Sequence, residues 1–468
     1  MSEPLAIHPH ILLPASEPAR GVAAELYAEI AGAPVVSPHG HIEAALLEQD
    51  NPWPDPAALL VTPDHYVTRL LHAHGIGLDE LRPPADARSI WRHLCEHWSL
   101  LSGTVVRLWL ELTLHDVLGA RVAPSAATAD LLFDELTERL AQPDCRPRAL
   151  YERFAIEALA TTDDPAEDLR HHEALAADPS FEGRVVPTFR PDAYLDLSQP
   201  GWPAQVERLA AAAEMAIDSY EDLVGALERR RSHFAAHGAT SSDHAVQHLR
   251  TERLDEVAAR RIFAAALRGG CDPREAAAFG AHMLDEMARM ACEDGLVMQL
   301  HPGVQRDHHG ATLQAHGPNA GADIPVRAEF TAALRPLLER YGTHPRFRIV
   351  LFTVDETTFS RELAPLAGFY PSVYLGAPWW FLDSPAGMLR FRQAVTETIG
   401  FHRTAGFVDD ARGLCSIGAR HEVARRVDCA FLAGLVCEHR LALAEAAAIA
   451  RDLAHDLPLR VFRLNARG

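Results

Sequence analysis

The chain contains no lysine, and this absence limits what it can bind. All 44 basic residues are arginine, set against 64 acidic residues, which gives a formal net charge of −20. A nucleic acid or an anionic membrane requires a basic surface, so we expect neither as a partner. A small anionic substrate is compatible with this charge if arginines are placed around it, because a guanidinium can hold a carboxylate through two hydrogen bonds.

Cysteine is scarce, and long apolar runs are missing. The seven cysteines are an odd number, lie far apart and include no Cys-x-x-Cys pair. This pattern is typical of buried thiols in a reducing compartment and argues against a disulfide framework. The first residues lack a basic stretch followed by an apolar one, and no apolar run approaches the roughly 18 residues of a membrane span. We therefore expect a cytoplasmic protein without a signal peptide.

The remaining composition is that of a globular protein, with 48% hydrophobic and 23% charged residues among 468. Short β-branched or apolar runs alternate with amphipathic segments of helical period. The expected strands are 35–39, 156–161, 184–189, 239–243, 295–300, 348–352, 372–376 and 406–409. The run at 239–243 is the weakest of them. About eight strand–helix units predict an α/β fold, specifically a (β/α)8 TIM barrel.

Helix signals support this alternation and indicate an insertion. One expected helix has Asp272 as its N-cap, Pro273 at its first position and Gly295 just past its end. The interval 43–150 is too long for a loop and has helical periodicity. We expect residues 1–42 to hold an N-terminal segment and the first strand, 43–150 an inserted α-helical subdomain over the barrel mouth, and 151–468 the rest of the barrel.

The pair His39 and His41 is the first candidate for chemistry. Residues i and i+2 of a strand face the same side, so both imidazoles can reach one cation at the end of the strand. With 26 histidines, chance alone predicts about one or two such patterns, and two more occur, at 8–10 and 72–74. Only the pair at 39 and 41 follows an expected barrel strand on the end where barrel enzymes place their active sites.

A third ligand is expected from the last strand. Asp409 and Asp410 end that strand, which in a closed barrel pairs with the first one. Alone, an Asp-Asp at a strand end is more often a helix N-cap. Beside a histidine pair, the metal-ligand interpretation is the stronger one.

Other candidates lie at the expected barrel mouth. His65 and Tyr66 begin a helix of the insertion, where a phenol could exchange protons and an imidazole could position a hydroxyl; a simple capped helix start is the alternative. Arg190 follows the third strand, and Arg306 follows the fifth. Surface ion pairs are their ordinary explanation, but together they could clamp a carboxylate. Trp380, after the seventh strand, could stack on a sugar face or belong to the core.

The ordered motifs resemble the uronate (glucuronate) isomerase family of the amidohydrolase superfamily over nearly the whole chain. Each motif alone is weak, but their order and spacing are specific. They are His39-Gly40-His41, Asp64-His65-Tyr66 with Arg69, Thr161 to Pro165 with Leu169 and His172, Arg190-Pro191-Asp192, Gln299-Leu300-His301 with Arg306, Trp379-Trp380-Phe381 with Asp383, and Arg420-His421-Glu422 with Arg425-Arg426.

The resemblance implies one divalent metal, with zinc the expected ion, on His39, His41 and Asp410. It also implies interconversion of D-glucuronate with D-fructuronate, of D-galacturonate with D-tagaturonate, or of both pairs. Moving a proton from C2 to C1 requires a base, for which Tyr66 and Asp410 are both candidates.

The same resemblance implies residues that hold the substrate. Arg190, Arg306 and Arg412 would bind the carboxylate and hydroxyls, with help from His65 and His301.

Two further hypotheses remain at this stage. A mononuclear metal-dependent hydrolase of a sugar-acid derivative is the main alternative; a binuclear one is disfavoured because Asp243 and His244, rather than a lysine, end the fourth strand. A non-catalytic sugar-acid binder is disfavoured because both histidines, Asp410, Tyr66 and the arginines are all retained. The sequence is compatible with a homo-oligomer but does not determine the oligomeric state.

Overall fold

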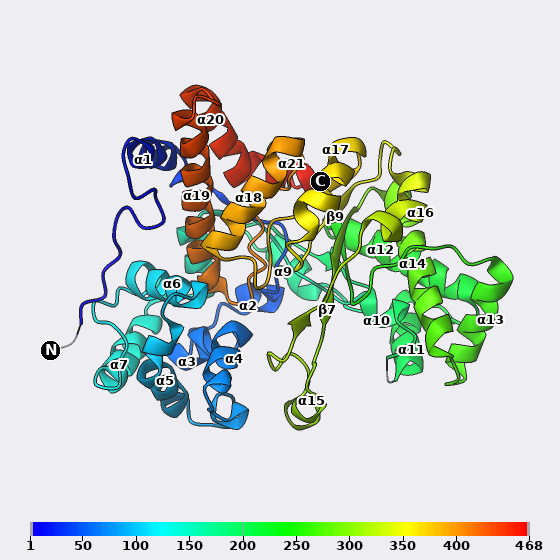
Figure 1. The fold of residues 1–468 in the computed structure, drawn as a ribbon. Helices are drawn as coiled ribbons and strands as arrows, with labels where there is room; N and C mark the ends of the chain where they lie inside the picture. Colours follow the sequence, from blue (N-terminus) through cyan, green and yellow to red (C-terminus); the bar gives the residue numbers. More distant parts are fainter. Residues whose placement is uncertain (1–2, 200, 466–468) are drawn as a thin grey trace.

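Parallel strands form the centre of the computed structural model, which describes residues 3–199 and 201–465 (Figure 1). The strands are β1 (Val35–Ser37), β2 (Ile156–Ala160), β3 (Val185–Val186), β4 (Thr188–Phe189), β5 (Ser241–Val246), β6 (Val297–Pro302), β7 (Val304–Gln305), β8 (Ile324–Pro325), β9 (Ile349–Leu351) and β10 (Val373–Leu375). One parallel sheet has the order β1-β2-β3, and a second has the order β10-β9-β6-β5-β4. β7 and β8 form a short antiparallel ribbon. The predicted α/β fold with parallel strands is confirmed.

Single bridges extend these sheets. Asp163 pairs with Phe189, which connects the first sheet to the second, and Leu375 pairs with Thr404 beyond β10. The expected strand at 406–409 is wrong as a regular strand, because no ladder forms there. Gly406 has a φ of 75°, outside the extended region, and this interrupts the pairing.

The central strands are covered on both faces. Every residue of β1, β6 and β9 is buried. Parallel strands between helical layers lose their polar alternation for this reason, since neither face meets water. The run at 239–243, the weakest in the sequence, begins β5, which continues to Val246 and pairs with β6 along its whole length.

The segment between β1 and β2 is helical. Its helices are α2 (Ala44–Gln49), α3 (Pro56–Leu60), α4 (His65–Ala73), α5 (Ala87–Glu96), α6 (Val105–Leu112), α7 (Ala129–Leu140) and α8 (Pro147–Arg153), with the short turns η1 (Leu78–Glu80), η2 (Trp98–Leu101), η3 (Thr113–Val117) and η4 (Pro143–Cys145). Helices α3 to α7 gather at the lower left of Figure 1. Most of their buried apolar side chains belong to one cluster that also contains Val35, Ile156 and Ile417, whereas Trp109 and Leu112 of α6 belong to a second cluster. The helical segment therefore packs directly against β1, β2 and a C-terminal helix.

The other helices surround the strands. They are α1 (Ala19–Ile30), α9 (Arg170–Ala177), α10 (Asp192–Leu195), α11 (Trp202–Ala213), α12 (Tyr220–Ala236), α13 (Glu256–Leu267), α14 (Pro273–Asp294), α15 (Gly310–His316), α16 (Thr331–Tyr341), α17 (Ala364–Phe369), α18 (Pro385–Ile399), α19 (Leu414–Cys437), α20 (Leu443–Arg451) and α21 (Leu457–Val461), with η5 (Phe359–Leu363) and η6 (Asp452–Asp456). α14 confirms the helix expected from its caps: the Asp272 side chain accepts from the Arg274 amide, and Gly295 ends the helix at a φ of 84°. Among the described helices, none combines the length and apolarity needed to cross a membrane.

Candidate active site

The end of β1 brings two imidazoles together. His39 and His41 follow the strand directly, and their ring centroids lie 5.4 Å apart. His39 is buried, and the His41 side chain is 22% exposed. The His41 amide donates to the carbonyl of Ala411 over 2.8 Å, which joins this segment to the one that carries Asp410.

Asp410 completes a group of three side chains that could hold a metal ion. Its Oδ1 lies 3.1 Å from His41 Nε2 and 3.5 Å from His39 Nε2. Asp410 has a φ of 45°, a left-handed conformation that is uncommon for a residue with a side chain. Such backbone strain recurs at functional sites, where the surrounding structure imposes it. The structure thus brings together the three residues expected as ligands.

The donor atoms of this group suit a divalent cation. The buried atoms His39 Nδ1 and Asp410 Oδ1 have no hydrogen-bond partner among the described residues. Burial lowers the pKa of His41 to about 4, so this imidazole is neutral at pH 7. Burial acts to raise the pKa of Asp410, but the two adjacent imidazoles outweigh it and hold that pKa well below its usual range. Burial acts to lower the pKa of His39, but the carboxylates of Asp243 and Asp410 outweigh it and raise that pKa. Zinc binds neutral imidazole and ionised carboxylate, which are the states of His41 and Asp410 at pH 7.

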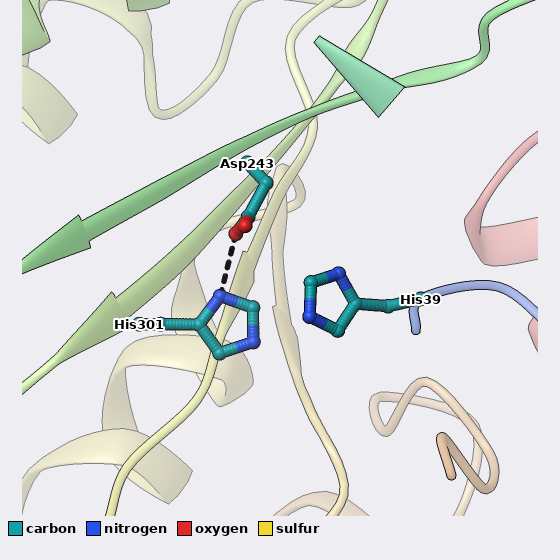
Figure 2. A group of neighbouring side chains, drawn as sticks. All are labelled: His39, Asp243 and His301. Carbon is teal, nitrogen blue, oxygen red and sulfur yellow. Dashed lines mark hydrogen bonds and ion pairs between the residues drawn. The ribbon is translucent and has the colours of Figure 1, made fainter. Parts of the chain in front are cut away.

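A second group shares His39 and is fully buried. Figure 2 shows His39 beside His301, with Asp243 joined to His301 by a hydrogen bond. His301 Nδ1 lies 2.7 Å from Asp243 Oδ1, and the rings of His39 and His301 stack with centroids 4.7 Å apart. Ligand atoms of these three residues also lie within 4.8 Å of one another. The fold therefore offers two overlapping groups that could hold a cation.

Asp243 is a site residue that the sequence analysis did not select. It lies on β5, and its carboxylate meets Arg190 Nη1 at 3.2 Å as well as His301. Arg190 Nε in turn donates to Asp192 Oδ2 over 2.9 Å. Its position at the end of the strand expected at 239–243 was the sequence feature that could have identified it as a site residue. Arg190, expected to bind substrate, thus already pairs with two carboxylates.

His65 and Tyr66 begin α4, as expected, with Asp64 as the N-cap that accepts from the Tyr66 amide over 2.8 Å. Their rings stack with centroids 5.2 Å apart, and the edge of His65 meets Trp380 at 5.3 Å. Burial lowers the pKa of His65 to about 3, so it is a neutral imidazole. The Tyr66 hydroxyl donates to Asp383 Oδ2 over 2.9 Å.

Two of the expected arginines are less committed than Arg190. Arg306 meets Asp323 only at 3.9 Å, and its guanidinium lies over the Trp380 ring at 4.7 Å. Arg412 forms no ion pair among the described residues and lines a cavity of 530 Å³ together with His41. These two guanidinium groups are available to an anion.

Trp380 is almost wholly buried, at 4% exposure. Its ring stacks on Phe381 with an interplanar angle of 5° and also contacts Arg306. These contacts hold Arg306 beside the candidate site and leave little of the ring exposed to a sugar.

A model of the glucuronate isomerase family matches residues 18–462. The uronate isomerase of Rhizorhabdus wittichii is 48% identical over 463 residues, which cover 98% of this chain and 99% of the relative. The crystal structure of glucuronate isomerase from Caulobacter crescentus superposes with a TM-score of 0.97 at 45% identity, covering 100% of this chain and 98% of that one. The uronate isomerase structure from Thermotoga maritima gives a TM-score of 0.93 at 28% identity, with 98% and 99% covered.

Proposed function

Because the chain belongs to the uronate isomerase family, we propose that it interconverts D-glucuronate and D-fructuronate, D-galacturonate and D-tagaturonate, or both pairs. The membership confirms the family expected from the ordered motifs, and with it the enzyme class, an aldose–ketose isomerase. It favours isomerisation over the hydrolase considered from the sequence. The observation that carries the proposal is the convergence of His39, His41 and Asp410, with Arg412 lining the same cavity as His41.

The expected cofactor is one zinc ion. Zinc prefers imidazole nitrogen and carboxylate oxygen, the donor set that His39, His41 and Asp410 supply. When bound, the ion supplies positive charge beside the substrate oxygens, where negative charge develops during proton transfer. The unpartnered Asp410 Oδ1, which lies 3.5 Å from His39 Nε2 and 3.1 Å from His41 Nε2, supports this assignment.

We place this chemistry at the mouth of a closed (β/α)8 barrel in a cytoplasmic enzyme. The bridges at Phe189 and Thr404 and the hydrogen bond between His41 and Ala411 support closure around the strands. Residues 43–150 would then form the subdomain inserted after the first strand, between 1–42 and 151–468.

The substrate carboxylate is the group that we assign to the arginines. Arg306 and Arg412 lack a close ion-pair partner among the described residues, so each can donate two hydrogen bonds to a carboxylate without breaking existing pairs. Arg190 would serve the hydroxyls from its fixed position beside Asp243. His65 and His301, both buried, would complete the hydrogen bonds to the sugar.

Isomerisation moves a proton from C2 to C1 and a hydroxyl proton from O2 to O1. The base takes the C2 proton, the C–H electron pair becomes a C1–C2 double bond, and the carbonyl oxygen gains a proton. The carbon proton then returns to C1 while the C2 hydroxyl loses its proton. Tyr66 and Asp410 remain the candidates for the carbon base. Tyr66 already donates its one proton to Asp383, which favours Asp410.

The proposal is tested by incubating zinc-loaded protein with D-glucuronate and with D-galacturonate in D2O. Ketose formation together with deuterium exchange at C2 is the expected result. Absence of both ketose and exchange across several uronates would rule the activity out.

A further inference from the structure

A chain of hydrogen bonds links Tyr66 to the segment that carries Asp410. The Tyr66 hydroxyl donates to Asp383 Oδ2, and Arg420 Nη1 donates to the same oxygen, each over 2.9 Å. Arg420 Nη1 also donates to the backbone carbonyl of Asp409 over 3.2 Å. One guanidinium therefore connects the acceptor of Tyr66 with the residue that precedes Asp410.

The aspartate and the arginine of this chain are enclosed by the protein. Asp383 is 5% exposed and Arg420 is 3% exposed. The Arg420 guanidinium lies 3.8 Å from the centre of the Trp109 ring, and the Tyr66 ring meets the same indole edge-on at 5.6 Å. A buried ion pair adds little stability compared with apolar packing of the same volume. The pair instead fixes the orientation of the groups that it contacts, Tyr66 and the Asp409 backbone.

The next residue of α19 holds the same segment through its side chain. His421 Nε2 lies 3.1 Å from Asp409 Oδ2, and Asp409 Oδ1 accepts from the Ala411 amide over 3.1 Å. Arg420 and His421 thus fix the backbone and the side chain of Asp409. The left-handed conformation of Asp410 lies between these fixed points.

We propose that Asp383 and Arg420 are positioning residues for the isomerisation: they fix the Tyr66 hydroxyl as a hydrogen-bond acceptor toward a substrate hydroxyl and hold it in register with the Asp410 turn. A phenol has one proton to donate, and here it is donated to Asp383, so the Tyr66 oxygen can act toward other groups only as an acceptor. Burial, and next the Asp383 carboxylate, raise the pKa of Tyr66 well above 10, so the donated proton stays in place at neutral pH. This inference rests on the proposed function.

The test is a double-mutant cycle between Asp383→Asn and Tyr66→Phe. The amide is isosteric with the carboxylate and still offers Arg420 an oxygen, so the fold is kept. We expect D383N alone to lower kcat about tenfold to a hundredfold, the usual consequence of losing a buried charged hydrogen bond, with KM changed less than about threefold. In the Y66F background, D383N should lower kcat by no more than about twofold further, because its effect acts through Tyr66.

The matched control is Asp428→Asn. Asp428 lies on α19, the helix that carries Arg420, and forms a buried pair with Arg392 through hydrogen bonds of 2.7 and 2.8 Å. In the described part of the chain, no contact joins Asp428 to Tyr66. D428N should retain kcat and KM and should combine additively with Y66F. The same two cycles are read in the free energy of unfolding, which needs no activity: D383N and Y66F should be coupled, and D428N and Y66F should not.

Equal loss of kcat from D383N in both backgrounds would overturn the inference, even if the unfolding cycle shows coupling. If Y66F is too slow to measure, D383N must still lower kcat where D428N does not, and must couple to Y66F in unfolding; failure of either result also overturns it. Failure of the proposed function looks different, because the unmutated protein would then isomerise no uronate.

Discussion

Two groups of histidine and aspartate side chains share His39, and they differ in how their carboxylates are paired. In one group, Asp243 accepts from His301 over 2.7 Å and meets Arg190 at 3.2 Å. In the other, Asp410 Oδ1 has no hydrogen-bond partner among the described residues and lies beside two imidazole nitrogens. The first carboxylate already has its counter-charge.

This difference indicates where a cation is needed. A buried carboxylate without a positive partner is costly, whereas one that is paired with a guanidinium is compensated. We therefore assign the proposed metal to the half of the site with His41 and Asp410, whereas Asp243 pairs with Arg190 and His301 in the other half. Geometry alone permits a cation in either group; charge pairing separates them.

The largest expected effect comes from His41→Ala. It removes one of the three proposed ligands, so we expect loss of stoichiometric zinc and a fall in kcat/KM of about a thousandfold or more. Metal content by atomic emission and kinetics with D-glucuronate are the measurements. His74→Ala changes an exposed histidine of another His-x-His pattern and should have no effect. Undiminished zinc and activity in H41A would assign the cation elsewhere.

Asp243→Asn should give a smaller effect of a different kind. Zinc should remain stoichiometric, while kcat falls about tenfold to a hundredfold because Arg190 and His301 lose their common acceptor. Asp192→Asn is the control, since Asp192 pairs with Arg190 but leaves His301 untouched. If D243N loses zinc and D192N retains it, the metal lies in the group of His39, Asp243 and His301, and our assignment is contradicted.

Arg412→Met and Arg306→Met should mainly raise KM, each by about tenfold to a hundredfold, because charged hydrogen bonds to the substrate carboxylate are lost. Zinc content should not change. Arg208, which is half exposed, gives a matched control as Arg208→Met, with an unchanged KM. Equal KM values for the R412M variant and the unmutated protein would remove Arg412 from the carboxylate site.

The smallest expected effect concerns acid stability. Burial is the largest single influence on the pKa of Asp243 and raises it, but Arg190 and His301 outweigh it and hold the pKa well below its usual range. A depressed carboxyl pKa contributes stability above the unfolded-state value near 4, and this contribution is lost as pH falls through the folded-state value. Between about pH 5 and about pH 3, D243N should thus lose less unfolding free energy than the unmutated protein in denaturant titrations. Parallel losses would deny Asp243 this stabilising role.

The parts of the site that could be predicted from the sequence are those that follow from the periodicity and order of the strands. The i, i+2 spacing of His39 and His41 predicted their shared direction, and expected strand closure predicted their approach to Asp410. Asp243 was not selected because its partners, Arg190 and His301, lie 53 and 58 residues away with no periodic relation.

Local backbone conformation was a second feature that could not be predicted from the sequence. The strand expected at 406–409 is interrupted at Gly406, which has a left-handed conformation that the apolar composition of the run does not reveal. The pairing of Asp383 with Arg420 likewise depends on how α19 packs, and neither residue's neighbours in sequence indicate it.

Anomalous diffraction at the zinc edge from crystals of the zinc-loaded protein tests the central claim most directly. We expect one anomalous peak within bonding distance of His39, His41 and Asp410, and none between Asp243 and His301. A peak bounded by His39, Asp243 and His301, or no ordered zinc at either group, would contradict the assignment of the metal.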